Sequence, residues 1–235
     1  MRVAAVVLLA ACGRIGFDDQ AAIDAAPPDP PALVQQGSAS DQNGNALAVT
    51  GLSPVREGDL LVAAVVAFGD STTTSVRDDV GDTFVSSGAN ATSASISGTT
   101  SIYYATTIGG ATTLDVRFDK AEGGEVWLLD FSGVDTLGSV NATNAMSAND
   151  MYLGPAITTT VANEVVVTHV QIDTNAITDV SAPFVMLPTL FGDDAAYAIT
   201  TTVGSYAATW TTVGGNGNGE ASITSFRPTS PRLAP

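Results

Sequence analysis

The chain has 235 residues, of which 45% are hydrophobic and 14% are charged, a composition typical of a folded globular protein. Acidic residues outnumber basic residues 24 to 8, which gives a formal net charge of -16 at pH 7. A surface of this sign repels nucleic-acid phosphates, so nucleic-acid binding is excluded as a function. Because Cys12 is the single cysteine, no disulfide can form within the chain.

Residues 1–11 have the pattern of a signal peptide for export. Arg2 supplies a positive charge, and Val3 to Ala11 form an apolar run that ends in small residues. A bilayer span needs about 20 apolar residues, so we expect this segment to be removed rather than kept as a transmembrane helix. The alternative is a plain secretory signal in which Cys12 has no special role.

The residues Leu9-Ala10-Ala11-Cys12 resemble the lipobox of bacterial lipoproteins. The resemblance implies that Cys12 becomes the first mature residue and carries acyl chains, such as palmitate, on its sulfur and amine. Two or three such chains hold a protein stably at a lipid bilayer. Gly13 follows the cysteine, which in similar envelope systems permits sorting to the outer membrane. We therefore expect a lipid-anchored component of the bacterial cell envelope, either periplasmic or surface-exposed.

Residues 12–31 are expected to form a linker. The stretch is rich in Ala, Asp and Pro and ends in Pro27-Pro28-Asp29-Pro30-Pro31. Proline fixes φ and removes backbone donors, so this run favours an extended polyproline II spacer over a packed element.

Residues 32–227 are expected to form one all-β domain, followed by a flexible tail at 228–235. Short runs rich in Val and Thr are broken by Gly, Asn and Asp at intervals of about eight to twelve residues, which is typical of sandwiches and barrels. No repeat array is evident. In chain order, the clearest expected strands are Asp59–Phe68, Ser101–Ile108, Thr112–Phe118, Glu125–Ser132, Glu164–Ile172, Ala195–Thr201, Ser205–Thr212 and Glu220–Phe226.

The pattern of apolar residues assigns the faces of two of these strands. Leu114, Val116 and Phe118 alternate with polar residues, as in a strand with one buried face. Residues 60–68 are almost all apolar, so this strand is expected to be covered on both faces. These patterns predict a two-sheet antiparallel β-sandwich, either jelly-roll or immunoglobulin-like, in preference to a closed barrel.

The strand-and-turn signatures at Gly58–Val62, Ser75–Phe84, Ser101–Ala105, Val126–Thr136 and Ala162–Val167 carry a further resemblance. Together they are similar to a widespread, largely uncharacterised β-sandwich module of bacterial surface and secreted proteins. The resemblance covers most of residues 45–227. It implies a fold and an exported setting, and no particular reaction.

Asp78, Asp79 and Asp82 form an acidic cluster between two strand-like segments. Carboxylates gathered in a loop are ligands that calcium prefers, so a calcium site is one hypothesis. The favoured alternative is a hairpin turn in which an Asp side chain caps backbone amides and Gly81 has a positive φ. Calcium is the one cofactor that the sequence suggests.

Sugar binding by a β-sandwich needs exposed aromatic rings flanked by polar groups. Tyr152, in a polar segment, and Trp210, on a mixed strand face, are the candidate ligand-binding residues. Tyr103, Tyr104, Tyr197 and Tyr206 are further available rings. Trp127 shares a strand face with Leu129 and Phe131 and is therefore expected in the core.

His169 is the only histidine, and the chain contains no Gly-x-Ser-x-Gly nucleophile elbow. A structural or solvent-facing role is therefore favoured for it over catalysis. The sequence predicts a non-enzymatic binding, structural or adhesion module that meets a glycan, a matrix component or another envelope protein. The alternatives are an exported carbohydrate-active hydrolase whose carboxylates converge only in the fold, and a calcium-stabilised sandwich.

Overall fold

The computed structural model describes residues 29–93, 96–146, 150–173, 176–214 and 217–230. The segment Pro28–Ser230 is one compact unit. The described residues contain strands and no helix, and thus no helix that could cross a membrane. All named strand pairs are antiparallel, so the all-β antiparallel prediction is confirmed.

The described residues form sixteen strands, which divide into two halves of eight. The first half, residues 32–132, contains β1 (Ala32–Asp41), β2 (Ala46–Val49), β3 (Leu60–Phe68), β4 (Thr73–Asp78), β5 (Val85–Ser93), β6 (Gly98–Thr106), β7 (Leu114–Phe118) and β8 (Gly124–Ser132). The second half, residues 134–228, contains β9 (Val134–Met146), β10 (Met151–Thr158), β11 (Val165–Ile172), β12 (Ala176–Val180), β13 (Val185–Met186), β14 (Asp194–Ile199), β15 (Ser205–Val213) and β16 (Asn218–Pro228).

Each half contains one five-stranded and one three-stranded sheet. In the first half the strand orders are β1-β8-β3-β6-β5 and β2-β7-β4. In the second half they are β9-β16-β11-β14-β13 and β10-β15-β12. Adding eight to each strand number of the first half gives the order of the second, so the two halves have the same topology.

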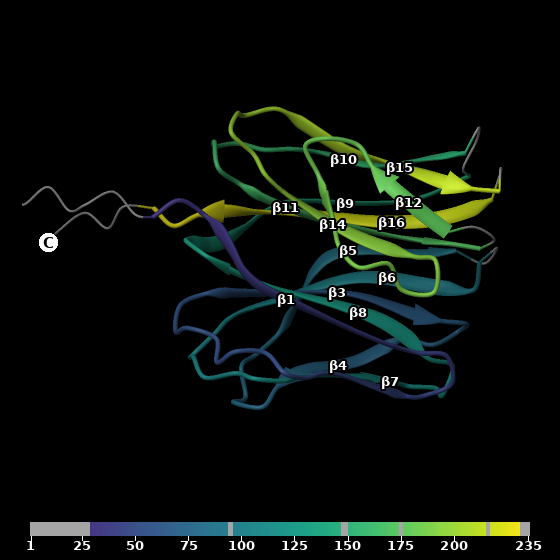
Figure 1. Cartoon of the computed structure of the whole chain (residues 1–235), viewed down its shortest axis with the longest axis horizontal. Helices are drawn as coiled ribbons and strands as arrows, with labels where there is room; N and C mark the ends of the chain where they lie inside the picture. The colour runs from purple at the N-terminus through teal and green to yellow at the C-terminus, as the bar shows by residue number, and fades with distance from the viewer. Residues whose placement is uncertain (1–28, 94–95, 147–149, 174–175, 215–216, 231–235) are drawn as a thin grey trace, which may run out of the picture. The chain divides into compact units, whose positions relative to one another are not determined.

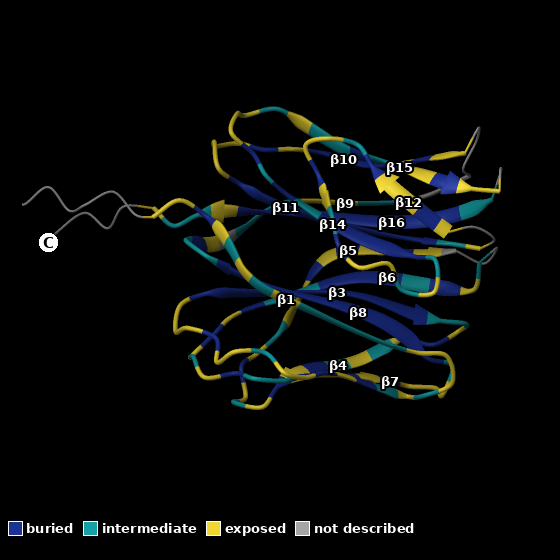
Figure 2. Ribbon diagram, viewed as in Figure 1, coloured by how far each residue is buried: buried dark blue, intermediate teal, exposed yellow. Residues whose placement is uncertain are grey.

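The four sheets stack as layers, with the two five-stranded sheets in the middle (Figure 1). One core lies between the two sheets of the first half, one between the two sheets of the second half, and one between the two five-stranded sheets. We call this central interface the seam. Figure 2 shows that the middle strands β3, β8, β11 and β16 are largely buried.

Strand β3 shows why the middle sheets need apolar residues on both faces. Leu61, Ala63, Val65 and Ala67 pack toward the outer sheet of the first half, while Leu60, Val62, Ala64 and Val66 pack into the seam. The predicted two-sided burial of this strand is therefore confirmed. The one-sided burial predicted for Leu114, Val116 and Phe118 of β7 is also confirmed, because these residues alternate with exposed ones.

The sequence retains only short traces of the repeat between the halves. Gly58-Asp59 precedes β3 and Asn163-Glu164 precedes β11, and both Gly58 and Asn163 have a positive φ. Gly-Glu opens β8 at residues 124–125 and recurs at 219–220 in β16, and each strand has a phenylalanine six residues after its Glu. Because strand topology tolerates wide changes of side chain, the repeat is visible in the strand order and is hard to see in the residues.

Candidate functional site

A groove of about 380 Å³ follows the outer edge of β4, and we call it the β4 groove. It is lined by residues 73–77 of β4, by residues 81–84 that follow this strand, and by Tyr103 of β6. Successive residues of a strand point to opposite faces, so a hollow lined by five in a row runs along the strand's edge. This edge is free of a neighbouring strand because β4 is the last strand of its sheet.

The lining of the β4 groove combines rings with hydrogen-bonding groups. Phe84 and Tyr103 are half-buried and pack against the core of the first half, which fixes the position of their rings. Hydroxyl groups come from Thr73, Thr74, Ser75 and Thr83, and Arg77 is exposed at one end. The volume falls within the range of small-molecule sites. A second hollow of about 320 Å³, lined by residues such as Asp70, Ser71 and Thr72, contains no aromatic ring.

Asp78, Asp79 and Asp82 lie in the turn that leads from β4 to residues 81–84, which line the other side of the β4 groove. Asp78 Oδ1 accepts hydrogen bonds from the backbone N–H groups of residues 80, 81 and 82 at 3.2, 2.7 and 2.9 Å, and Gly81 has a φ of 91°. Asp79 accepts from Thr112, and Asp82 accepts from the N–H of Ile108. The three carboxylates therefore hold backbone amides in place, as the turn interpretation expects.

The calcium hypothesis for these residues finds no support in their arrangement. Among the described residues, no group of three His, Cys, Asp or Glu side chains is placed so that it could hold a metal ion. Burial raises the pKa of Asp78, and its interaction with Asp82 raises it further. Burial acts to raise the pKa of Asp82 as well, but hydrogen bonds from Asp78, Thr107 and Ile108 lower it overall. Of the two carboxyls, Asp78 therefore holds a proton more readily than Asp82.

The exposure predicted for Tyr152 and Trp210 is wrong. Both side chains are fully buried, and they lie opposite each other on β10 and β15 in the core of the second half. The polar sequence around Tyr152 favours a loop, but the structure has strand β10 beginning at Met151. Residues 147–149 lie outside the described residues. Neither ring is available to a ligand.

Cys12 lies outside the described residues. The core position predicted for Trp127 is confirmed, because its side chain is buried.

A second polar feature, which the sequence analysis missed, lies at one end of the seam. Glu125 of β8, Glu220 of β16 and Asp193, just before β14, are buried there together with His169 and Gln171 of β11. We call Glu125, Asp193 and Glu220 the seam carboxyls. The alternation of side chains along β8 predicts the burial of Glu125. This residue points to the same face of the strand as Trp127, Leu129 and Phe131, which are buried in the seam.

Burial dominates the electrostatics of the seam carboxyls. It raises the pKa values of Glu125 and Asp193, and the negative charge of each neighbouring aspartate raises the pKa of Glu125 further. Burial, together with the charge of Asp193, raises the pKa of Glu220 to about 8. Burial lowers the pKa of His169 to about 3, so the imidazole is neutral. At neutral pH Glu125, Glu220 and His169 are therefore predominantly uncharged, while Asp193, whose pKa is raised to about 7, is near its midpoint.

No protein-family model matches the chain, and no curated protein or solved structure matches it either. Any function therefore has to be inferred from the β4 groove, the seam and the N-terminal sequence themselves.

Proposed function

We propose that this chain is a lipid-anchored, non-enzymatic binding module of a bacterial cell envelope, and that it holds a glycan in the β4 groove. The observation that carries the proposal is the lining of this groove, where the rings of Phe84 and Tyr103 stand among four hydroxyl side chains. Apolar ring faces and hydroxyl hydrogen bonds together suit the mixed surface of a sugar. The anchoring part of the proposal rests on Leu9-Ala10-Ala11-Cys12.

The strand order supports a jelly-roll interpretation of each half, and this interpretation accounts for the groove. A jelly roll has eight strands in two sheets, and the orders β1-β8-β3-β6 and β2-β7-β4 fit it. The fifth strand would then be expected beside β4. Instead β5 pairs with β6, and residue pairs such as Val85 and Tyr104 fix this register. The place beside β4 is left open as the groove.

Two features of β4 favour a glycan over an added peptide strand. The pairing of β4 with β7 shifts register between Thr73 and Ser75, and the strand has only six residues. A bulge and an exposed charge such as Arg77 are devices that discourage strand addition at a sheet edge. The groove is therefore better suited to a ligand that contacts side chains than to a peptide strand that pairs with backbone N–H and C=O groups.

The hydrolase alternative has weaker support from the geometry. The carboxyls with the most strongly raised pKa values lie in the seam, with no exposed surface on Glu125 or Glu220. Asp82 lines the groove, but its Oδ2 atom is buried and Oδ1 accepts a backbone hydrogen bond. A glycosidase needs two carboxyls that reach the scissile bond. A binding role therefore fits the groove better.

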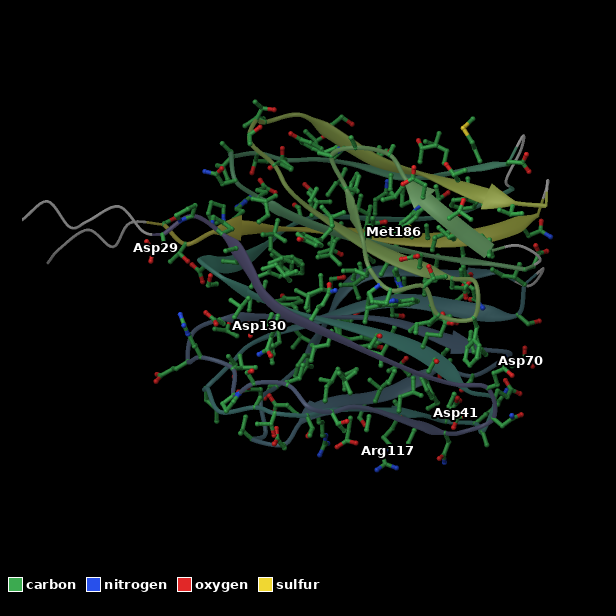
Figure 3. The ribbon with its side chains drawn as sticks, in the orientation of Figure 1. Asp29, Asp41, Asp70, Arg117, Asp130 and Met186 are labelled. Carbon is green, nitrogen blue, oxygen red and sulfur yellow. The ribbon has the colours of Figure 1, made fainter. Side chains whose placement is uncertain are left out.

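A glycan array probed with the full-length chain in mild detergent tests the proposal. We expect a restricted set of glycans to bind, and we expect Tyr103→Ala to lose that binding at least tenfold. Arg117→Ala is the matched control, because Arg117 projects from β7 away from the sheet and does not line the groove (Figure 3). Absence of any bound glycan, or equal binding by Tyr103→Ala, would contradict the proposal. Capture of peptides in place of glycans would show that the groove accepts a strand.

A further inference from the structure

The seam changes character along its length. At one end, rings and aliphatic side chains such as Phe131, Phe226 and Leu60 fill the space between the middle sheets. At the other end the same strands present the seam carboxyls, His169 and Gln171. Polar groups also cross the seam there, since Thr100 of β6 and Ser222 of β16 share a hydrogen bond of 2.9 Å between their hydroxyls. One end of the interface between the halves is therefore built from titratable groups.

These groups are buried with few compensating contacts. Both carboxyl oxygens of Glu125 and of Glu220, both ring nitrogens of His169, and Gln171 Oε1 find no hydrogen-bond partner among the described residues. Gln171 Oε1 approaches Gly98 of the first half so closely that a Cβ there would overlap it. A buried carboxyl without partners is tolerated far better as the neutral acid than as the anion.

Within the described part of the chain, no positive charge shifts the pKa of a seam carboxyl. Glu125 comes from β8, His169 from β11, Asp193 from the turn before β14, and Glu220 from β16. The charges that shift the pKa values of Glu125 and Glu220 are those of Asp193 and, for Glu125, Asp194 on the opposite face of β14. The strands β3 and β6 contribute apolar residues, Thr100 and, at the apolar end, Tyr104. Ionisation of one seam carboxyl therefore makes ionisation of the next more costly.

The turn at residues 190–193 closes the polar end of the seam. Leu190 and Asp193 exchange two backbone hydrogen bonds of 3.0 and 2.7 Å, and Asp193 Oδ1 also accepts from the N–H of Ile172. Phe191, at the tip, has a φ of 38°, is 55% exposed and contacts the ring of Phe68. A positive φ at a bulky residue is strained, so this turn carries backbone strain next to the buried Asp193.

We infer that the seam is a pH-sensitive switch, closed while its carboxyls hold protons and opened at the turn 190–193 when they ionise. The direction follows from linkage. The folded state holds protons on these carboxyls at pH values where the unfolded chain has lost them, so the closed form is favoured at low pH. The pKa of Asp193 is raised to about 7, that of Glu220 to about 8 and that of Glu125 to about 10. Closure is therefore lost as the pH rises from neutral into the alkaline range.

Amide hydrogen exchange of the full chain between pH 5 and pH 9.5 tests this switch, with rates corrected for the intrinsic effect of pH. The reporters are the amides of Ile172, Leu187, Leu190 and Asp193, whose hydrogen bonds depend on the turn. We expect the opening constant at these amides to rise by up to about tenfold per pH unit for each carboxyl that ionises. Amides in β7, which packs in the first-half core and not in the seam, should keep their protection.

Glu125→Gln and Glu220→Gln keep the shape of the protonated acids and should flatten this pH dependence, while Asp115→Asn, at an exposed position of β7, should not. Asp193→Asn provides a second route if a glutamine variant does not fold. The inference is overturned by turn protection that does not change with pH, by an unchanged slope in the glutamine variants, or by equal loss of protection across β7.

Discussion

Tyr104 of the first half packs edge-on against Phe226 of the second, with ring centroids 5.4 Å apart. The reciprocal pair is Tyr197 against Phe131, at 5.7 Å. Tyr104 and Tyr197 lie at equivalent positions, opposite the third residue of β3 and of β11. Each half thus gives a tyrosine to the other half's phenylalanine, which is the reciprocity of a two-fold symmetric dimer. The halves meet within one chain as two copies meet across such an interface.

This reciprocity predicts the energetics of the seam. Phe131→Ala and Phe226→Ala should each lower the free energy of unfolding by about 3–5 kcal/mol, because both rings are fully buried. In denaturant titrations, Tyr104→Ala combined with Phe226→Ala should show a coupling of about 0.5–1.5 kcal/mol. The control is Tyr104→Ala combined with Phe131→Ala, which should be additive. Equal coupling in both double variants would contradict the pairing.

Asp130 predicts a pH dependence in the first half. Its side chain is 1% exposed, it accepts a hydrogen bond from Gln35 at 3.0 Å, and burial raises its pKa to about 6. The stability that accompanies its proton is present below about pH 4 and is lost as the pH rises through 6. Asp130→Asn should therefore raise the free energy of unfolding at pH 8 by on the order of 1 kcal/mol and leave it unchanged at pH 4.

Measurement of unfolding at both pH values separates this effect from a general one. A stabilisation of equal size at pH 4 and pH 8 would show that the charge of Asp130 is not its cause. Asp119→Asn is a suitable control, because hydrogen bonds lower the pKa of Asp119 in the folded protein. The Asp119 variant should therefore show no gain in the free energy of unfolding at pH 8.

Gly58 predicts a backbone effect with little change in contacts. Its φ is 86°, and a Cβ at this position would have nothing within 4 Å. Gly58→Ala should therefore lower the free energy of unfolding by about 1 kcal/mol through backbone strain alone. Gly204→Ala is the control, because Gly204 does not have a positive φ and the nearest atom to its Cβ would be Tyr206 Cε2 at 3.8 Å. Thermal or chemical unfolding that ranks the two variants equally would contradict the argument.

The N-terminal sequence predicts the location of the protein. Cys12→Ser removes the sulfur to which the acyl chains would be attached, so the variant should leave the membrane fraction, or accumulate with its leader uncut. The wild-type chain should carry two or three acyl chains on Cys12 by mass spectrometry. An unmodified thiol at Cys12 in membrane-associated protein would contradict the anchor.

The sequence predicts the strands whose side chains alternate clearly or are apolar throughout. β3 and β7 are examples, and β8, β11, β14, β15 and β16 follow the same logic. It does not predict β1, β5 or β9, which are edge strands rich in Ser, Gly, Ala and Asn, because their main attachment is backbone pairing with a neighbour. The predicted exposure of Tyr152 is wrong for a related reason, because a polar stretch of sequence can lie next to a buried strand.

The β4 groove could not be predicted from local pattern. The groove exists because β5 pairs with β6 and not with β4. No residue of β5 predicts which of these two strands, both distant in sequence, becomes its neighbour. The sequence identifies Tyr103 as an available ring, but its place beside Phe84 follows only from the pairing of β5 with β6. Glu125 of the seam differs, since its parity with Trp127, Leu129 and Phe131 within β8 predicts its burial once the strand is assigned.

The most direct test of the central claim is a calorimetric titration of the full-length chain with a glycan retained by the array. The account predicts saturable binding by the wild-type chain and by Arg117→Ala. It predicts that Phe84→Ala and Tyr103→Ala weaken binding by tenfold or more, which is about 1.4 kcal/mol. Undiminished affinity in both groove variants, with their folds intact, would contradict the assignment of the β4 groove as the binding surface.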